Sequence, residues 1–194
     1  MTPEETKRLQ SRLGVTPDGD FGRNTWTALF AKLGAGPERA QELALSANVH
    51  CPAHEINTPL RLAHFLAQVA HESGGFRYME EIASGAAYEG RADLGNTETG
   101  DGKRYKGRGP IQCTGRANYR KYGRLLGIDL ERHPEILSTP SLGLLVGCLY
   151  WRENGLNALA DRDDTLAITK RINGGLNGIA DRRQRLTICK GLLL

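Results

Sequence analysis

The sequence lacks any apolar run long enough to cross a membrane. Its longest apolar stretch, residues 142–151, is far short of the roughly 20 residues that a spanning helix needs. The amino terminus lacks the charged and then apolar segment of a secretory signal peptide. Few stretches alternate apolar and polar residues, as half-buried strands would. We therefore expect a mainly α-helical protein without an export signal and without stable membrane insertion.

Cysteines are few and widely separated in the chain, at positions Cys51, Cys113, Cys148 and Cys189. Their spacing matches no zinc site, and without an export signal we expect them to stay reduced. His50, Cys51 and His54 lie close together but supply only three donors, with Pro52 between them. We expect no metal and no cofactor.

Charge is distributed unevenly along the chain. The net charge is +4, and residues 101–194 hold 17 Lys plus Arg against 9 Asp plus Glu, which leaves −4 for residues 1–100. A basic half suits an anionic polymer. Residues 103–108 alternate cations with Tyr105, which could suggest nucleic acid, but no DNA-binding motif accompanies them. We expect no nucleic acid partner.

One predicted helix ends in a carboxylate. Thr58 caps it, Pro59 lies in its first turn, and apolar residues follow at helical spacing until Gly74. Glu72 lies in the last turn, where the helix dipole disfavours negative charge and so favours the protonated form that a general acid needs. Glu81 follows nine residues later. Two carboxylates across a groove are the minimal apparatus for glycoside hydrolysis.

Three sequence blocks carry a resemblance to a known family. They are residues 65–76, which contain His71-Glu72-Ser73-Gly74-Gly75, residues 107–112, which read Gly-Arg-Gly-Pro-Ile-Gln, and residues 172–175 with Asp181 and Arg182. In this order the blocks resemble glycoside hydrolase family 19, which contains the chitinases and related phage endolysins. The resemblance covers residues 58–190 and implies an inverting reaction, with the two carboxyls roughly 6.5 to 9.5 Å apart.

The resemblance also implies roles for individual residues. Glu72 matches the general acid, and Glu81 matches the general base of the shorter, phage-type members. Thr114 stands where the family has a Ser or Thr that helps to hold the attacking water. Further matches are the substrate-binding Gln112, Asn118 and Asn173, to which we add Tyr105 as a candidate, and the supporting residues His71 and Arg182.

Two other carboxylates compete for the role of base. Glu80 adjoins Glu81, but neighbouring residues rarely point the same way, so one of the two faces the groove. Glu89 lies in a loop-like segment that could reach the groove and is the alternative base. The residue without this role is expected to pair with Arg77 or Arg91 at the surface.

Residues 1–34 form a predicted helical hairpin. Thr2 to Glu5 is a capping box for a helix through Leu13, and a second helix is expected over residues 22–33. The segment resembles a helical peptidoglycan-binding repeat, but it is too small to be stable alone and is expected to pack on the rest. Whether it binds wall polymer or only docks stays open. The expected catalytic domain is residues 35–194.

Further helices are expected over residues 38–49, 118–126, 140–151, 164–171 and 180–192, with a mostly irregular segment over residues 84–110 that includes a short hairpin. Together they predict a two-lobed, lysozyme-like helical domain with a substrate groove. The sequence thus predicts a monomeric peptidoglycan hydrolase, a phage-type endolysin or muramidase made in the host cytoplasm and acting on the wall in the periplasm. The alternatives are a chitinase and a non-catalytic wall-binding protein.

Overall fold

Helices make up nearly all the regular structure of the protein. A computed structural model describes all 194 residues and contains no sheet, which confirms the expected mainly α fold. Three short 3-10 helices and two isolated bridges complete it. The α-helices are α1 (Pro3–Leu13), α2 (Arg23–Lys32), α3 (Pro37–Ala53), α4 (Pro59–Glu72), α5 (Asp101–Arg104), α6 (Arg116–Leu126), α7 (Pro140–Glu153), α8 (Leu156–Asp161), α9 (Thr165–Asn173) and α10 (Ile179–Leu193).

Local capping signals explain where several helices begin. Thr2 and Glu5 form the expected capping box at α1. The Thr58 hydroxyl accepts the Arg61 N–H at α4, and the Asp164 carboxylate accepts the Ala167 N–H at α9. Such side chains satisfy backbone donors that a helix start leaves unpaired. These beginnings were therefore predictable from sequence.

Two helical segments differ from expectation. Helix α3 continues through Pro52 to Ala53 instead of ending at residue 49. Pro52 is tolerated because its missing N–H removes only one hydrogen bond from the last turn of the helix. Helix α8 was not predicted at all. Its six residues are too few for a helical period, and burial of Leu156 and Ala160 against the core holds it.

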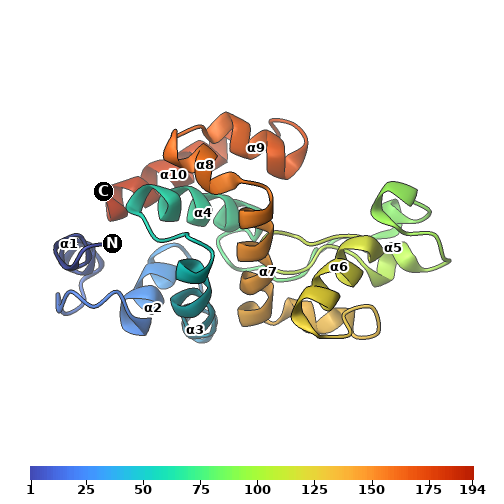
Figure 1. The fold of residues 1–194 in the computed structure, drawn as a ribbon, viewed down its shortest axis with the longest axis horizontal. Helices are drawn as coiled ribbons and strands as arrows, with labels where there is room; N and C mark the ends of the chain where they lie inside the picture. Colours follow the sequence, from blue (N-terminus) through green and yellow to red (C-terminus); the bar gives the residue numbers. More distant parts are fainter.

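Two hydrophobic cores divide the protein into two lobes (Figure 1). The larger core joins α1 to α4 with α8, α9 and α10, and the smaller core lies under α6. Helix α7 stands between them: Trp151 and Leu144 belong to the large core, and Val146 belongs to the small one. This helix therefore fixes the position of each lobe relative to the other. No helix is both long and apolar enough to pass through a membrane.

The first two helices share the large core. Leu9 from α1 and Trp26, Leu29 and Phe30 from α2 are at most 1% exposed in it. Arg12 also donates a hydrogen bond to the Leu192 carbonyl at 2.8 Å. The predicted hairpin thus packs on the rest of the chain, and the division at residue 34 stays a prediction.

The segment between α4 and α6 is mostly irregular, as expected, apart from the short α5 and two 3-10 helices. Three short stretches are joined in it by backbone hydrogen bonds. The N–H of Glu81 donates to the Gly107 carbonyl at 2.8 Å, and the N–H of Gly109 donates to Met79 at 2.8 Å. Arg108 and Cys113 exchange two backbone hydrogen bonds. This hairpin lies at residues 108–113, slightly after the expected range, and it places residues 79–81 beside residues 107–114.

We predict that Trp26→Ala lowers the free energy of unfolding by about 4 kcal/mol, because it empties a fully buried aromatic site. Urea unfolding followed by circular dichroism measures this change, and one transition is expected for the whole chain. Leu45→Ala is the control, since Leu45 is 49% exposed, and it should change stability by less than about 0.5 kcal/mol. A separate early transition in Trp26→Ala would contradict the shared core.

Candidate active site

Glu72 is held by an arginine from the far end of the sequence. Arg182 on α10 is 2% exposed, and its guanidinium donates to the carboxyl oxygen Oε1 of Glu72 and to Oε1 of Gln68, both on α4. Oxygen Oε2 of Glu72 accepts no hydrogen bond. A buried guanidinium needs such partners. Nothing near residue 72 in the sequence indicates this cation, which lies directly against the Glu72 carboxyl.

His71 is oriented by a second pair of contacts from α10. Its Nδ1 lies 2.6 Å from Oδ2 of Asp181, which also accepts a hydrogen bond from Arg185 at 2.7 Å. Burial would raise the pKa of Asp181, but the hydrogen bonds from His71 and Arg185 outweigh it and lower that pKa overall. Asp181 therefore remains a carboxylate and fixes the His71 ring beside Glu72.

Glu81 is held by two donors, one on each oxygen. The Tyr88 hydroxyl donates to Oε1 at 3.0 Å, and the Gly107 N–H donates to Oε2 at 3.2 Å. The backbone of Glu81 is joined to Gly107 as well. The carboxylate is thereby fixed against residues 107–114 of the smaller lobe.

Three side-chain oxygens converge over the Cα of Gly107. A Cβ built on Gly107 would lie 2.6 Å from Oε1 of Gln112, 3.2 Å from Oγ1 of Thr114 and 3.3 Å from Oε2 of Glu81. Gln112 reaches this place through a left-handed backbone conformation, with φ of 55°. Glycine at 107 is what lets these three groups meet.

The other two carboxylates lie elsewhere. Glu80 contacts Lys106 and Arg108 at 3.0 and 3.1 Å. Both oxygens of Glu89 accept backbone N–H groups, from Gly100 and Gly102. The expected pairing with Arg77 or Arg91 is wrong: Arg77 bonds the Gly74 carbonyl, and Arg91 pairs with Asp93. The reason is that loop 84–104 folds back on itself and supplies Glu89 with nearer donors.

A cavity of about 220 Å³ joins Thr114 to the larger lobe. Gln112, Thr114 and Asn118 supply its polar wall, and the Asn118 amide is fixed by a hydrogen bond to the Thr114 carbonyl at 2.8 Å. Tyr150 lines it from α7. Burial, and next the charge of Glu72, raise the pKa of the Tyr150 hydroxyl. Neither Glu72 nor Glu81 lines the cavity itself. Its apolar wall is Leu94, Ile111, Cys113, Tyr122, Val146, Tyr150 and Ile172.

Two of the expected substrate contacts differ in their surroundings. Asn173 is exposed at the end of α9, directly after the cavity-lining Ile172. Tyr105 is 2% exposed, and its hydroxyl donates to the Glu131 carbonyl at 3.1 Å. The ring of Tyr105 packs with Tyr119 in the smaller core and lines a separate hollow that neither Glu72 nor Glu81 lines, so its role as a substrate contact stays a prediction.

Sequence reasoning missed Tyr88 and Tyr150, which contact the candidate site from a loop and from α7. Neither carries a local signal, because each reaches the site only through the fold. Nowhere do three or more His, Cys, Asp or Glu side chains gather as a metal site would need. Burial raises the pKa of the Cys113 thiol to about 12, which leaves it protonated and a poor nucleophile.

A sequence model described as "Chitinase class I" matches residues 25–158. The chain belongs to glycoside hydrolase family 19. An endochitinase of Arabidopsis thaliana is 37% identical to this family 19 chain over 115 residues, which are 59% of this chain and 39% of that protein. This chain therefore spans about two fifths of that relative. A glycosyl hydrolase family 19 domain-containing protein of Haemophilus influenzae is 32% identical over 147 residues, covering 60% of this chain and 72% of that protein.

Solved family 19 structures share the fold. Chitinase C from Streptomyces griseus superimposes with a TM-score of 0.66 at 24% identity, covering 86% of this chain and 75% of that one. A class IV chitinase from Zea mays gives 0.67 at 22% identity, covering 89% and 92%. The chain thus has the helical fold of solved chitinases, as expected from its sequence.

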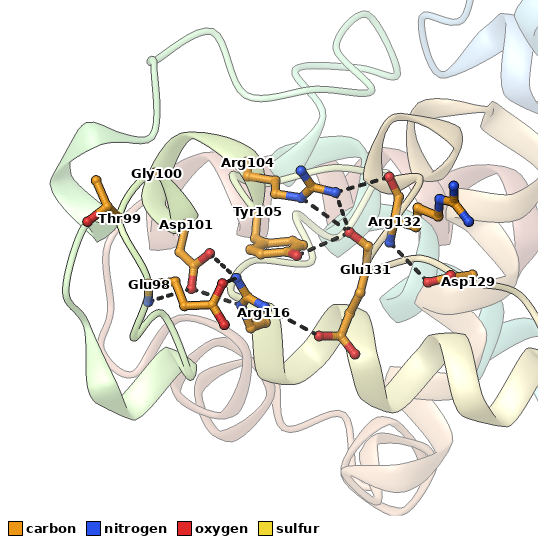
Figure 2. A pocket seen from close by; sticks show the side chains of 10 residues that line it. All are labelled: Glu98, Thr99, Gly100, Asp101, Arg104, Tyr105, Arg116, Asp129, Glu131 and Arg132. Carbon is orange, nitrogen blue, oxygen red and sulfur yellow. Dashed lines mark hydrogen bonds and ion pairs between the residues drawn. The ribbon is translucent and has the colours of Figure 1, made fainter.

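A second, wider hollow of this family 19 hydrolase lies on the smaller lobe (Figure 2). It measures about 690 Å³ and is lined mainly by charged groups that pair with one another, with Arg116 contacting Glu98, Asp101 and Glu131. Neither Glu72 nor Glu81 lines it. These ion pairs join loop 96–105 to the start of α6.

We predict that Gly107→Ala reduces hydrolysis by this family 19 enzyme by roughly 100-fold while its circular dichroism spectrum is unchanged. The added methyl would fill the space where the oxygens of Glu81, Gln112 and Thr114 converge. Gly191→Ala is the matched control, because a Cβ at Gly191 meets nothing within 4 Å. Full activity in Gly107→Ala would show that this convergence is not needed.

Proposed function

We propose that this family 19 hydrolase cleaves peptidoglycan at the β-1,4 bond between N-acetylmuramic acid and N-acetylglucosamine, with inversion at the anomeric carbon. The observation that carries the proposal is that two carboxyls on opposite lobes are each held by donors of their own. Arg182 holds Glu72, while Tyr88 and the Gly107 N–H hold Glu81 close to the cavity-lining Gln112 and Thr114. One carboxyl has a free oxygen, and the other faces a hydroxyl and an amide. This is the division of roles that an inverting glycosidase needs.

In the proposed reaction Glu72 is the general acid. Its free oxygen Oε2 gives a proton to the glycosidic oxygen as the bond to the anomeric carbon breaks. Arg182 holds Oε1 and, through Gln68, fixes the carboxyl in one orientation. His71, whose ring is held by Asp181, lies next to Glu72 at the end of α4.

Glu81 is the proposed general base. It takes a proton from a water that attacks the anomeric carbon from the opposite face, and the Thr114 hydroxyl helps to hold that water. The convergence of Glu81, Thr114 and Gln112 over Gly107 supports this assignment. Asn118 and Asn173 are the proposed amide contacts to substrate, beside and at the edge of the cavity.

Charge supports an anionic glycan over neutral chitin. Residues 101–194 carry 17 Lys plus Arg against 9 Asp plus Glu. Peptidoglycan carries carboxylates on its muramic acid and peptide stems. An excess of positive charge raises the local concentration of such a substrate.

The remaining parts of the proposal follow from the sequence resemblance. We propose a monomeric, phage-type endolysin that is made in the bacterial cytoplasm and acts on the wall. Residues 1–34 are proposed either to bind the wall or only to dock, and their burial in the large core supports docking.

Chitin hydrolysis is the second candidate. The observation that favours it is that the relatives include endochitinases and chitinases by name. A non-catalytic wall-binding role is the third and predicts that loss of either carboxyl leaves all biological effect intact. These three candidates differ in which glycan, if any, the protein cleaves.

We predict that the purified protein releases muropeptides with reducing muramic acid ends from Gram-negative peptidoglycan, and that Glu72→Gln lowers this release at least 100-fold because the proton donor is gone. Mass spectrometry of the soluble products measures both. Glu135→Gln is the control, since it makes the same chemical change on an exposed residue.

The same incubation with soluble chitin oligomers separates the alternatives. Products from chitin alone would reassign the substrate to chitin. Release that persists in both Glu72→Gln and Glu81→Gln would contradict the two-carboxylate mechanism, and no products from either substrate would favour the binding role.

A further inference from the structure

We propose that Tyr88 is a positioning residue for hydrolysis, which holds the Glu81 carboxylate so that one of its oxygens faces Thr114. The inference rests on the proposed function, because it deepens the assignment of Glu81 as the base. Tyr88 lies seven residues after Glu81 in sequence and is brought back to it by the loop between them.

The contact fixes a torsion that would otherwise be free. The last torsion of a glutamate side chain is broad, so one hydrogen bond leaves the carboxylate able to turn. Here Tyr88 holds Oε1 at 3.0 Å while the Gly107 N–H holds Oε2 at 3.2 Å. With a donor on each oxygen, Oε2 stays beside the Cα of Gly107, where the side-chain oxygens of Thr114 and Gln112 also lie.

Tyr88 is itself tied to the helix that follows Thr114. The Asn96 side chain is fully buried; its amide donates to the Tyr88 carbonyl at 2.9 Å, and its oxygen accepts the Arg116 N–H at 2.9 Å. Arg116 is the first residue of α6 and lies two residues after Thr114. Asn96 therefore joins the backbone of Tyr88 to the start of α6. The phenol that holds Glu81 and the Thr114 hydroxyl thus belong to one rigid unit.

The loop that carries Tyr88 is fixed at close range. Gly115 has φ of 89°, and a Cβ there would lie 2.6 Å from the Leu94 carbonyl oxygen, so the loop touches the start of α6 directly. The buried Asp101 carboxylate accepts from the Arg116 guanidinium and from the Glu98 N–H (Figure 2). It also accepts from the Thr97 N–H. Buried polar groups satisfied in this way rigidify a segment.

Tyr88 has the chemistry of a permanent donor. Burial, and then the hydrogen bond and charge of Glu81, raise the pKa of its hydroxyl, against a smaller opposing effect of Arg91. The phenol therefore stays protonated where the enzyme works and gives its proton to the hydrogen bond without titrating.

The test compares Tyr88→Phe with Tyr78→Phe on whichever glycan the wild-type protein hydrolyses. Tyr78 is 45% exposed and its hydroxyl makes no hydrogen bond, so it serves as the matched control. For Tyr88→Phe we expect kcat to fall by about 10- to 100-fold with KM within about twofold, because orientation of the base is lost and substrate contacts are kept. Tyr78→Phe should keep wild-type values.

A spectroscopic measurement tests the contact without turnover. With tyrosines labelled at the ring carbon that bears oxygen, carbon NMR follows the ionisation of Tyr88, assigned by the signal that Tyr88→Phe removes. In Glu81→Gln the pKa of Tyr88 should fall from its wild-type value, because the carboxylate charge that raises it is gone. Circular dichroism confirms that each variant is folded.

The outcomes separate this inference from the proposed function. Wild-type kcat in Tyr88→Phe, when Glu81→Gln is inactive, overturns the role of Tyr88 and leaves Glu81 as the base. A low kcat in Tyr88→Phe with an unchanged Tyr88 titration in Glu81→Gln also overturns it, because Tyr88 then acts by another route. Wild-type turnover in Glu81→Gln overturns the proposed base itself.

Discussion

The buried guanidinium of Arg182 is the constraint on which the candidate site depends. Taking this cation out of water is costly unless anionic and polar partners meet it, and Glu72 and Gln68 on α4 are those partners. The pairing requires α4 and α10 to pack side by side along their lengths, and Figure 1 shows them adjacent in the larger lobe. Helix α10, the last helix of the chain, thereby determines where the Glu72 carboxyl points. The same helix supplies Asp181 to His71, so one element orients both polar residues at the end of α4.

On the opposite side of the site, backbone hydrogen bonds position the segment that carries Glu81, whereas a buried guanidinium positions Glu72. Glu81 stands on a short chain segment whose hydrogen bonds run to residues 107–109, and the turn at residues 109–112 returns the chain so that Gln112 and Thr114 face it. Helix α7 connects this wall to the larger lobe, because its faces belong to both cores. The two carboxyls are therefore positioned by separate means and related through one helix.

Much of the fold could be predicted because its signals are local. Thr58 with Pro59, the Thr2 capping box and Asp164 each mark a helix start by satisfying nearby N–H groups. The positions of Glu72 and Glu81 followed from motif resemblance. What could not be predicted depends on contacts distant in sequence: a tyrosine among arginines looks exposed, yet Tyr119 buries the ring of Tyr105. Glu89 looked free for catalysis because its partners, the N–H groups of Gly100 and Gly102, have no sequence signal.

If a water activated by Glu81 attacks the anomeric carbon opposite Glu72, as we propose, the first product must have inverted configuration. Proton NMR of the newly formed reducing end, recorded within the first minutes of cleavage and before mutarotation, measures this directly. We expect the α-anomer to appear first from a β-linked glycan and to relax later to the equilibrium mixture. Initial formation of the β-anomer would mean a covalent or substrate-assisted retaining reaction and would contradict the assignment of Glu81 as a base acting through water.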